Sequence, residues 1–273
     1  MGINPRKPLG QHFLVANGVI NIITKAAQIE STDTVVEVGP GLGILTEALV
    51  KQTPKVIAIE LDEKLADALS DRIQSDGLKI IAEDARNVDI KKVTKGVRYK
   101  LISNLPYYAA GPILRHFIES EHPPETAVIM VQREVAKQMV AKPGQMSLVS
   151  IGTQIYGDTK IVSFIPSSAF YPKPKVTSAI VKIDTYDNPL IDHTNRKSFF
   201  SVVRGGFSAP RKQLRNSLAQ GLKISTTAAT YHLRSAGIQP EARPSTLSLE
   251  DWKTLHLVIK ENSIDSSPLI QNE

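Results

Sequence analysis

The 273-residue sequence contains no cysteine. This absence excludes disulfides, thiolate metal sites and cysteine nucleophiles, and it fits a reducing compartment. No run of residues approaches the roughly 18 apolar positions that a membrane span requires. The first residues, MGINPRKPLGQHFL, lack the apolar segment of a signal peptide, and Arg6 stands where a myristoylation signal has Ser or Thr. We therefore expect a soluble, cytoplasmic protein with no membrane partner.

The sequence is also poor in metal-binding patterns and in tryptophan. Its six histidines are scattered without the spacing of metal ligands, so we expect no metal site. The single tryptophan, Trp252, falls in an amphipathic helical pattern and is most simply a core residue.

Positive charge is concentrated in one segment. Residues 192–223 contain seven basic residues and one acidic residue, so this segment carries an excess equal to the whole net charge of +6. Such an excess suits a surface for a phosphate backbone, although a solvated helix face would look the same.

From about residue 34 the sequence alternates apolar β-branched runs with amphipathic helical patterns. The runs TVVEVG, KVIAIEL, LKIIAED, YKLISN and TAVIMV are typical of buried strands, and the intervening segments space apolar residues by three and four. This alternation predicts an α/β domain with a parallel sheet. Two further strands, TKIVSFIP and KVTSAIVKID, suit an antiparallel edge, which gives a mostly parallel seven-stranded sheet.

Strand patterns end near residue 190. Four helical patterns follow, and Ser248 is placed to cap the last of them. We therefore predict an α/β domain over residues 1–187, a small all-helical domain over 188–262 and a flexible tail over 263–273.

A glycine-rich turn follows the first of these strands. In EVGPGLGI, Gly39, Gly41 and Gly43 let a ligand approach the backbone, or serve only a tight turn. Ile44 stands where a dinucleotide-binding fingerprint needs a small residue, so NAD fits poorly. No lysine follows the glycines, which excludes a Walker-type phosphate-binding loop.

Acidic residues end the next two strands. Glu60 is placed to accept hydrogen bonds from ribose hydroxyls, and Asp84 is placed to meet an adenine amine. Either could be a solvated loop acid, but with the glycine turn they form a set at successive strand ends. In this combination the domain resembles Rossmann-like methyltransferases that use S-adenosylmethionine.

The stretch YKLISNLPYYAAG brings Asn104 to the same sheet edge. An exocyclic adenine amine is a poor nucleophile because its lone pair is delocalised into the ring. The Asn104 side-chain oxygen and a neighbouring backbone carbonyl could accept both amine N–H bonds and favour a pyramidal nitrogen. Pro106 would stiffen the turn, and Tyr107 could stack on the base. Tyr108 is expected to be structural.

NLPY resembles the signature of adenine-N6 methyltransferases. GQHFL, EVGPGLG, IELD, EDA, SAFYPKPKVTSAIV, GGFSAPRKQLRNSL and RPSTLSLEDW occur in the expected order. From about residue 8 to about residue 260, the chain resembles the small-subunit ribosomal RNA adenine N6-dimethyltransferase family, typified by bacterial KsgA. The resemblance implies transfer of two methyl groups from S-adenosylmethionine to each of two adjacent adenosines. These lie in the loop of the 3′-terminal hairpin of 16S-type RNA, and the substrate is an immature 30S-type particle late in assembly.

The resemblance also assigns residues to roles. The cofactor pocket would be lined by His12, Leu14, Gly39, Gly41, Glu60, Asp84 and Asn104. Asn104 and the Leu105 carbonyl would hold the target amine, and Tyr107 and Phe170 would sandwich the adenine. On the sequence alone, Phe170 could equally be a core residue. His12 stands where many members of the family have Asn, and either side chain can donate a hydrogen bond.

The resemblance also implies that the basic segment of the helical domain binds the RNA, in particular through Arg204, Arg211, Lys212 and Arg215. We expect a monomer that takes an unstacked or flipped adenosine. Two alternatives stay open: the related methyltransferases that modify large-subunit RNA, and a binding factor that has kept the fold but lost the chemistry.

Overall fold

The computed structural model describes residues 12–265, with side chains described up to residue 262. Two compact units are present. The first contains the described residues up to Lys137 together with Tyr156–Asp187, and the second contains Gln138–Ile155 and the residues from Asn188 onward. The division at 187/188 coincides with the boundary predicted from the sequence, whereas residues 138–155, which the prediction placed in the first domain, belong to the second unit.

The physical reason lies in the loop around Gly144. The backbone N–H groups of Gly144 and Met146 donate to the Ser245 carbonyl at 2.8 and 3.1 Å. Backbone groups buried in a fold need partners, and this loop finds them in the C-terminal part of the chain. The sequence shows no composition shift that would reveal it.

The first unit is built on a seven-stranded sheet with the order β4-β3-β2-β5-β6-β9-β7. The strands are β2 (Thr34–Val38), β3 (Val56–Glu60), β4 (Leu78–Ala82), β5 (Tyr99–Asn104), β6 (Thr126–Gln132), β7 (Gly157–Ile165) and β9 (Ser178–Thr185). The first five strands in this order, β4, β3, β2, β5 and β6, pair in parallel with their neighbours. β9 pairs antiparallel with both β6 and β7. All seven predicted strands are therefore present, and the sheet is mostly parallel as expected.

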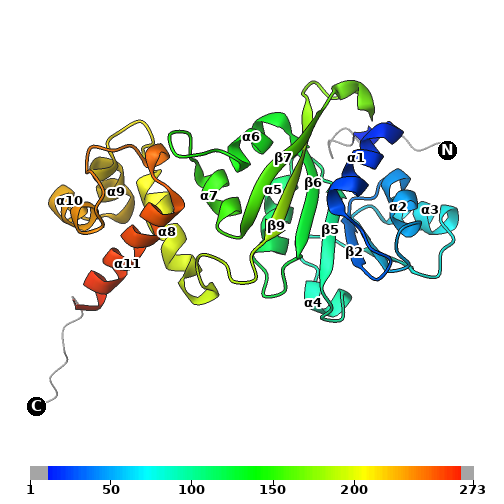
Figure 1. Cartoon of the computed structure of the whole chain (residues 1–273), viewed down its shortest axis with the longest axis horizontal. Coiled ribbons are helices and arrows are strands. Elements are labelled where there is room, and N and C mark those ends of the chain that lie inside the picture. Colours follow the sequence, from blue (N-terminus) through cyan, green and yellow to red (C-terminus); the bar gives the residue numbers. More distant parts are fainter. Residues whose placement is uncertain (1–11, 266–273) are drawn as a thin grey trace, which may run out of the picture. The chain divides into compact units, whose positions relative to one another are not determined.

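Apolar β-branched composition explains the centre of this sheet. Every residue of β2 and β3 is buried, whereas β4, at the sheet edge, is half-buried to exposed. Helices cover the sheet, as Figure 1 shows for this unit. The helices of this unit are α1 (Asn17–Ala27), α2 (Ile44–Val50), α3 (Glu63–Arg72), α4 (Ile90–Val93) and α5 (Ala110–Ile118), while α6 (Arg133–Met139) begins in this unit and ends in the second.

Two elements of this unit have no counterpart in the sequence predictions. Helix α1 buries Val19, Ile20 and Ile23 in the main core. A small second sheet pairs β1 (Phe13–Leu14) antiparallel with β8 (Phe170–Tyr171). It joins the start of the described chain to the connection between β7 and β9, beside the strand ends described below.

The second unit contains α7 (Leu148–Gln154), α8 (Arg196–Gly206), α9 (Leu214–Leu222), α10 (Thr226–Ser235) and α11 (Leu249–Asp265). Trp252 is fully buried and stacks on Phe207 with ring centroids 5.6 Å apart, so its core role is confirmed. Ser248 accepts from the Asp251 N–H at 3.1 Å and caps α11, as predicted. That helix runs past the expected end at residue 262, and residues 266–273 of the predicted tail lie outside the described part.

No described helix is both long enough and apolar enough to span a membrane.

Candidate active site

Four neighbouring strands bring their carboxyl ends to one edge of the sheet. The order β4-β3-β2-β5 places the glycine turn after β2 between the ends of β3 and β5. Asp84 follows β4, Glu60 ends β3 and Asn104 ends β5, and all three line one cavity with Gly39 and Gly41. Open α/β sheets bind ligands at this edge, where the strand order reverses.

The glycine turn forms the floor of this cavity. Gly39, Gly41 and Gly43 have φ angles of 68°, 54° and 77°, the left-handed region that favours glycine. A Cβ at Gly43 would lie 2.3 Å from Leu69 Cδ1, so any other residue here would also have to displace the end of that side chain. The turn thus holds its backbone close to whatever occupies the cavity.

Glu60 has a fixed orientation at the end of β3. Its two carboxylate oxygens accept the backbone N–H groups of Gly41, at 3.2 Å, and Asp62, at 3.0 Å. Burial raises the pKa of Glu60, while these backbone donors act to lower it. Each oxygen keeps a lone pair for a further donor, such as a ribose hydroxyl.

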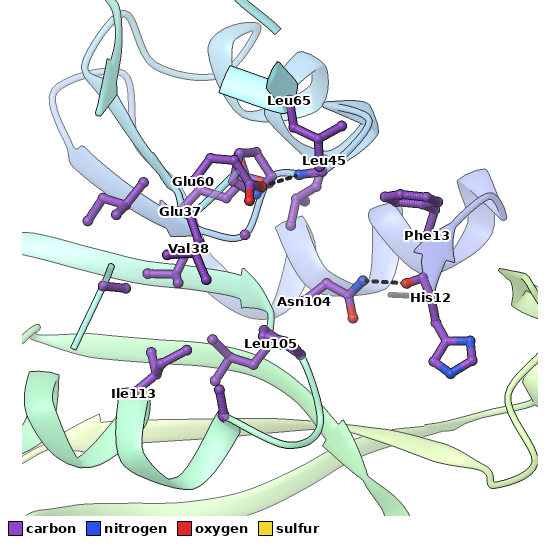
Figure 2. Close-up of a pocket in the computed structure, with 18 of the residues that line it drawn as sticks. His12, Phe13, Glu37, Val38, Leu45, Glu60, Leu65, Asn104, Leu105 and Ile113 are labelled. Atoms are coloured by element: carbon purple, nitrogen blue, oxygen red, sulfur yellow. Dashed lines mark hydrogen bonds between the residues drawn. The ribbon is translucent and has the colours of Figure 1, made fainter. Parts of the chain in front are cut away.

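Glu37 lies close to Glu60 below the glycine turn, as Figure 2 shows. Its side chain is 1% exposed and accepts the Thr46 hydroxyl at 2.7 Å. Burial raises the pKa of Glu37 to about 8, opposed by the Thr46 hydrogen bond and assisted by the charge of Glu60. Glu37 is therefore mostly protonated at neutral pH, so Glu37 and Glu60 do not both carry a full negative charge.

Asp84 is held by a residue that the sequence did not single out. Arg86 Nε donates to both carboxylate oxygens of Asp84, at 2.9 and 3.1 Å, and Arg86 Nη2 donates at 2.5 Å. The Arg86 hydrogen bonds hold the pKa of Asp84 below its usual value. Asp84 is thus a fixed anion at the cavity wall, next to an exposed guanidinium.

Asn104 reaches from the end of β5 towards the N-terminal part of the described chain, as Figure 2 shows. Its amide nitrogen donates to the His12 carbonyl over a long 3.5 Å. In this orientation the amide nitrogen faces His12 and Oδ1 is the acceptor of the side chain. A ligand N–H at this strand end therefore meets an oxygen.

Tyr107 connects the loop after β5 to two other elements. Its hydroxyl lies 2.6 Å from Ser178 Oγ, and its ring centroid lies 5.8 Å from that of His12. Burial raises the pKa of Tyr107, against the effect of Ser178, so the phenol stays neutral. Tyr108, expected to be structural, lines the cavity and is 55% exposed.

The structure brings nearly all of the residues expected at the site to this cavity. Its lining includes His12, Leu14, Gly39, Gly41, Glu60, Asp84, Asn104, Leu105, Pro106 and Tyr107. Of the motif GQHFL, only His12, Phe13 and Leu14 fall within the described residues. Among the described residues, no cluster of three or more acidic or histidine side chains could hold a metal ion.

Phe170 is the exception. It is 4% exposed, packs in the main core with Leu14 and Ile20, and is absent from the cavity lining. The expectation that Phe170 forms one side of an adenine sandwich is therefore not met by its position. The physical reason is the β1–β8 pairing, which turns Phe170 towards the core, the second of the two positions expected from the sequence.

Phe13, Glu37, Arg86 and Tyr108 also line the cavity but were not predicted as site residues. Glu37 could have been found from its place two residues before the first glycine. Arg86 gives no sequence signal, because its role depends on the side chain folding back over Asp84.

The four basic residues expected to bind RNA belong to the second unit. Arg204, Arg211 and Lys212 are exposed on α8 and the loop that follows it. Arg215 on α9 is half-buried and forms an ion pair with Glu241 at 2.8 Å. A partly exposed ion pair is weak. Even so, the negative charge of Glu241 makes Arg215 less available to a phosphate than the other three basic residues.

Comparisons with known proteins agree with this geometry. Residues 2–261 match the model of the ribosomal RNA adenine dimethylase family. The chain is 46% identical over 262 residues to the ribosomal RNA small subunit methyltransferase A of Dehalococcoides mccartyi, covering 95% of this chain and 90% of the relative.

Two solved structures share the fold. A dimethyladenosine transferase from Plasmodium falciparum has a TM-score of 0.79 at 24% identity, covering 92% of this chain and 98% of its own. The 23S rRNA methyltransferase ErmE has a TM-score of 0.72 at 23% identity, covering 91% and 99%. With the family match and the 46% identical relative, these findings place the chain in the ribosomal RNA adenine dimethylase family.

Proposed function

We propose that the protein transfers methyl groups from S-adenosylmethionine to N6 of two adjacent adenosines in small-subunit ribosomal RNA. The two adenosines lie in the loop of the 3′-terminal hairpin, and each receives two methyl groups. The observation that carries the proposal is the Asn104 amide, oriented by His12 in a cavity that Glu60 and Asp84 also line. The relative from Dehalococcoides mccartyi supports the small-subunit substrate.

The residues of the cavity fit such a cofactor. Glu60, with both oxygens oriented by backbone donors, would accept the ribose hydroxyls. Asp84 would accept the adenine amine, and the backbone of Gly39 and Gly41 would approach the amino-acid part. When bound, the cofactor supplies an electrophilic methyl group on sulfur.

Asn104 and its loop would prepare the nucleophile. Asn104 Oδ1 and the Leu105 carbonyl would each accept one N–H of the target amine, which favours a pyramidal nitrogen with a directed lone pair. No strong base is required, because the amine proton becomes acidic only as the new N–C bond forms. Pro106 restricts the turn, and Tyr107, anchored to Ser178, would stack on the base.

The basic surface of the second unit would bind the RNA backbone. Arg204, Arg211 and Lys212 are exposed cations suited to phosphates, with Arg215 contributing less because of Glu241. We place the activity in the cytoplasm, on an immature 30S-type particle late in assembly, with the protein acting as a monomer.

The test is Asn104→Ala with purified protein, S-adenosylmethionine and immature small subunits. Mass spectrometry of the 3′-terminal RNA fragment should show dimethyladenosine with the wild type and a loss of about 100-fold or more in rate with the variant. The melting temperature should not change, which separates a loss of chemistry from a loss of folding. Asn21→Ala, an exposed asparagine on α1, is the matched control.

Other results would separate the alternatives. Methylation of large-subunit RNA instead would favour the group to which ErmE belongs. Binding of small subunits with no methyl transfer by the wild type would favour a non-catalytic factor.

A further inference from the structure

An exposed aromatic residue lies next to the buried Phe170. Tyr171 is 66% exposed, more than any other large hydrophobic side chain of the described chain. Both residues belong to β8, where successive side chains point to opposite faces. Because Phe170 packs into the core, Tyr171 faces away from it.

The pairing of β8 with β1 shows what Tyr171 faces. Tyr171 is directly opposite Phe13, and directly opposite residues of an antiparallel pair have their side chains on the same face. Phe13 lines the cavity, and its ring lies 3.1 Å from where a Cβ on Gly41 would be. Tyr171 therefore shares a face with the cavity residue Phe13, and the next residue, Pro172, contacts the cavity residue His12 through its carbonyl.

The segment after Tyr171 is attached at both ends to residues of the cavity. His12 Nδ1 lies 2.6 Å from the Pro172 carbonyl, and the Tyr107 hydroxyl lies 2.6 Å from Ser178 Oγ. Residues 172–178 are therefore held at both ends next to residues of the cavity, one of which, Tyr107, would stack on the target base. Loop residues held in this way are positioned by the scaffold.

Two lysines project from this attached segment. Lys173 and Lys175 are both exposed, and neither forms an ion pair with the described part of the chain. One exposed aromatic ring and two cations therefore lie within five consecutive residues, with no acidic residue among them. Proteins bind single-stranded nucleic acid with this combination of stacking rings and backbone-tracking cations.

We infer that Tyr171, Lys173 and Lys175 form a second RNA-contacting surface, separate from the basic helices of the C-terminal unit. Tyr171 stacks on a base that flanks the target adenosine, and the two lysines bind the adjoining phosphates. The inference rests on the proposed RNA substrate. It gives the α/β unit its own part in positioning the nucleotides beside the cavity.

The test measures binding of an RNA oligonucleotide with the sequence of the small-subunit 3′-terminal hairpin, without any methyl transfer, across a salt titration. Tyr171→Ala should weaken binding roughly 5- to 100-fold, and Tyr171→Phe should restore most of it. Lys173→Gln with Lys175→Gln should reduce the slope of log affinity against log salt by about 1.4. S-adenosylmethionine binding and melting temperature should not change.

Matched controls lie at the edge of the seven-stranded sheet opposite to the strand ends that line the cavity. Tyr186→Ala removes a tyrosine just beyond β9, and Lys51→Gln with Lys55→Gln removes two exposed lysines in the loop before β3. Neither should alter affinity or salt slope.

Wild-type affinity and wild-type salt slope in both Tyr171→Ala and the double lysine variant would overturn the inference. That result is the one expected if this surface binds a protein and not RNA. Because binding is measured without catalysis, a wild type that binds RNA but fails to methylate it would defeat the proposed function alone.

Discussion

Replacing Glu37 by Gln should change how stability depends on pH. Glu37 is buried below the glycine turn, and its pKa is raised from 4.5 to about 8, first by burial and then by the charge of Glu60. A carboxyl whose folded pKa exceeds its unfolded value binds more protons when folded. Its contribution to stability is complete below pH 4.5 and is lost as pH rises towards 8.

The magnitude follows from the two pKa values. Between them, each pH unit lowers the free energy of unfolding by about 1.4 kcal/mol. At pH 7 the wild type should have lost roughly 3 kcal/mol relative to pH values below 4.5. Glu37→Gln keeps an oxygen that can accept the Thr46 hydroxyl but does not titrate, so it should lack this loss.

The assay is urea unfolding at pH 5, 6, 7 and 8, followed by far-UV circular dichroism. The only tryptophan, Trp252, lies in the second unit, so its fluorescence would follow a part of the protein remote in sequence from the change. The variant should gain stability over the wild type with rising pH, and the exposed substitution Glu63→Gln should not. Parallel profiles for wild type and Glu37→Gln would refute the reasoning.

Two other variants test the glycine turn and the basic helices. Gly43→Ala should destabilise the protein by about 1–3 kcal/mol, because its φ is 77° and the new Cβ would meet Leu69; urea unfolding measures this, and wild-type stability would contradict it. Arg211→Gln with Lys212→Gln should flatten the salt dependence of small-subunit binding by one to two units of slope, since each phosphate contact contributes about 0.7–0.9. An unchanged slope in a filter-binding titration would remove these residues from the RNA interface.

Much of the site could be predicted because a parallel sheet brings successive strand ends to one edge. Gly39, Glu60, Asp84 and Asn104 each follow or end an apolar run that is readable as a strand. Once these runs are parallel neighbours, their terminal residues must lie together. The two-unit organisation could also be predicted from the sequence, because strand patterns end near residue 190 and only helical patterns follow.

What the sequence alone determined was therefore the sheet, the strand-end residues and the family. The tertiary structure decided which way individual side chains face. Strands of two residues carry no periodicity, so the β1–β8 pairing that buries Phe170 and exposes Tyr171 has no sequence signal. The bond from Arg86 to Asp84 and the assignment of residues 138–155 to the second unit likewise depend on contacts that exist only after the chain has folded.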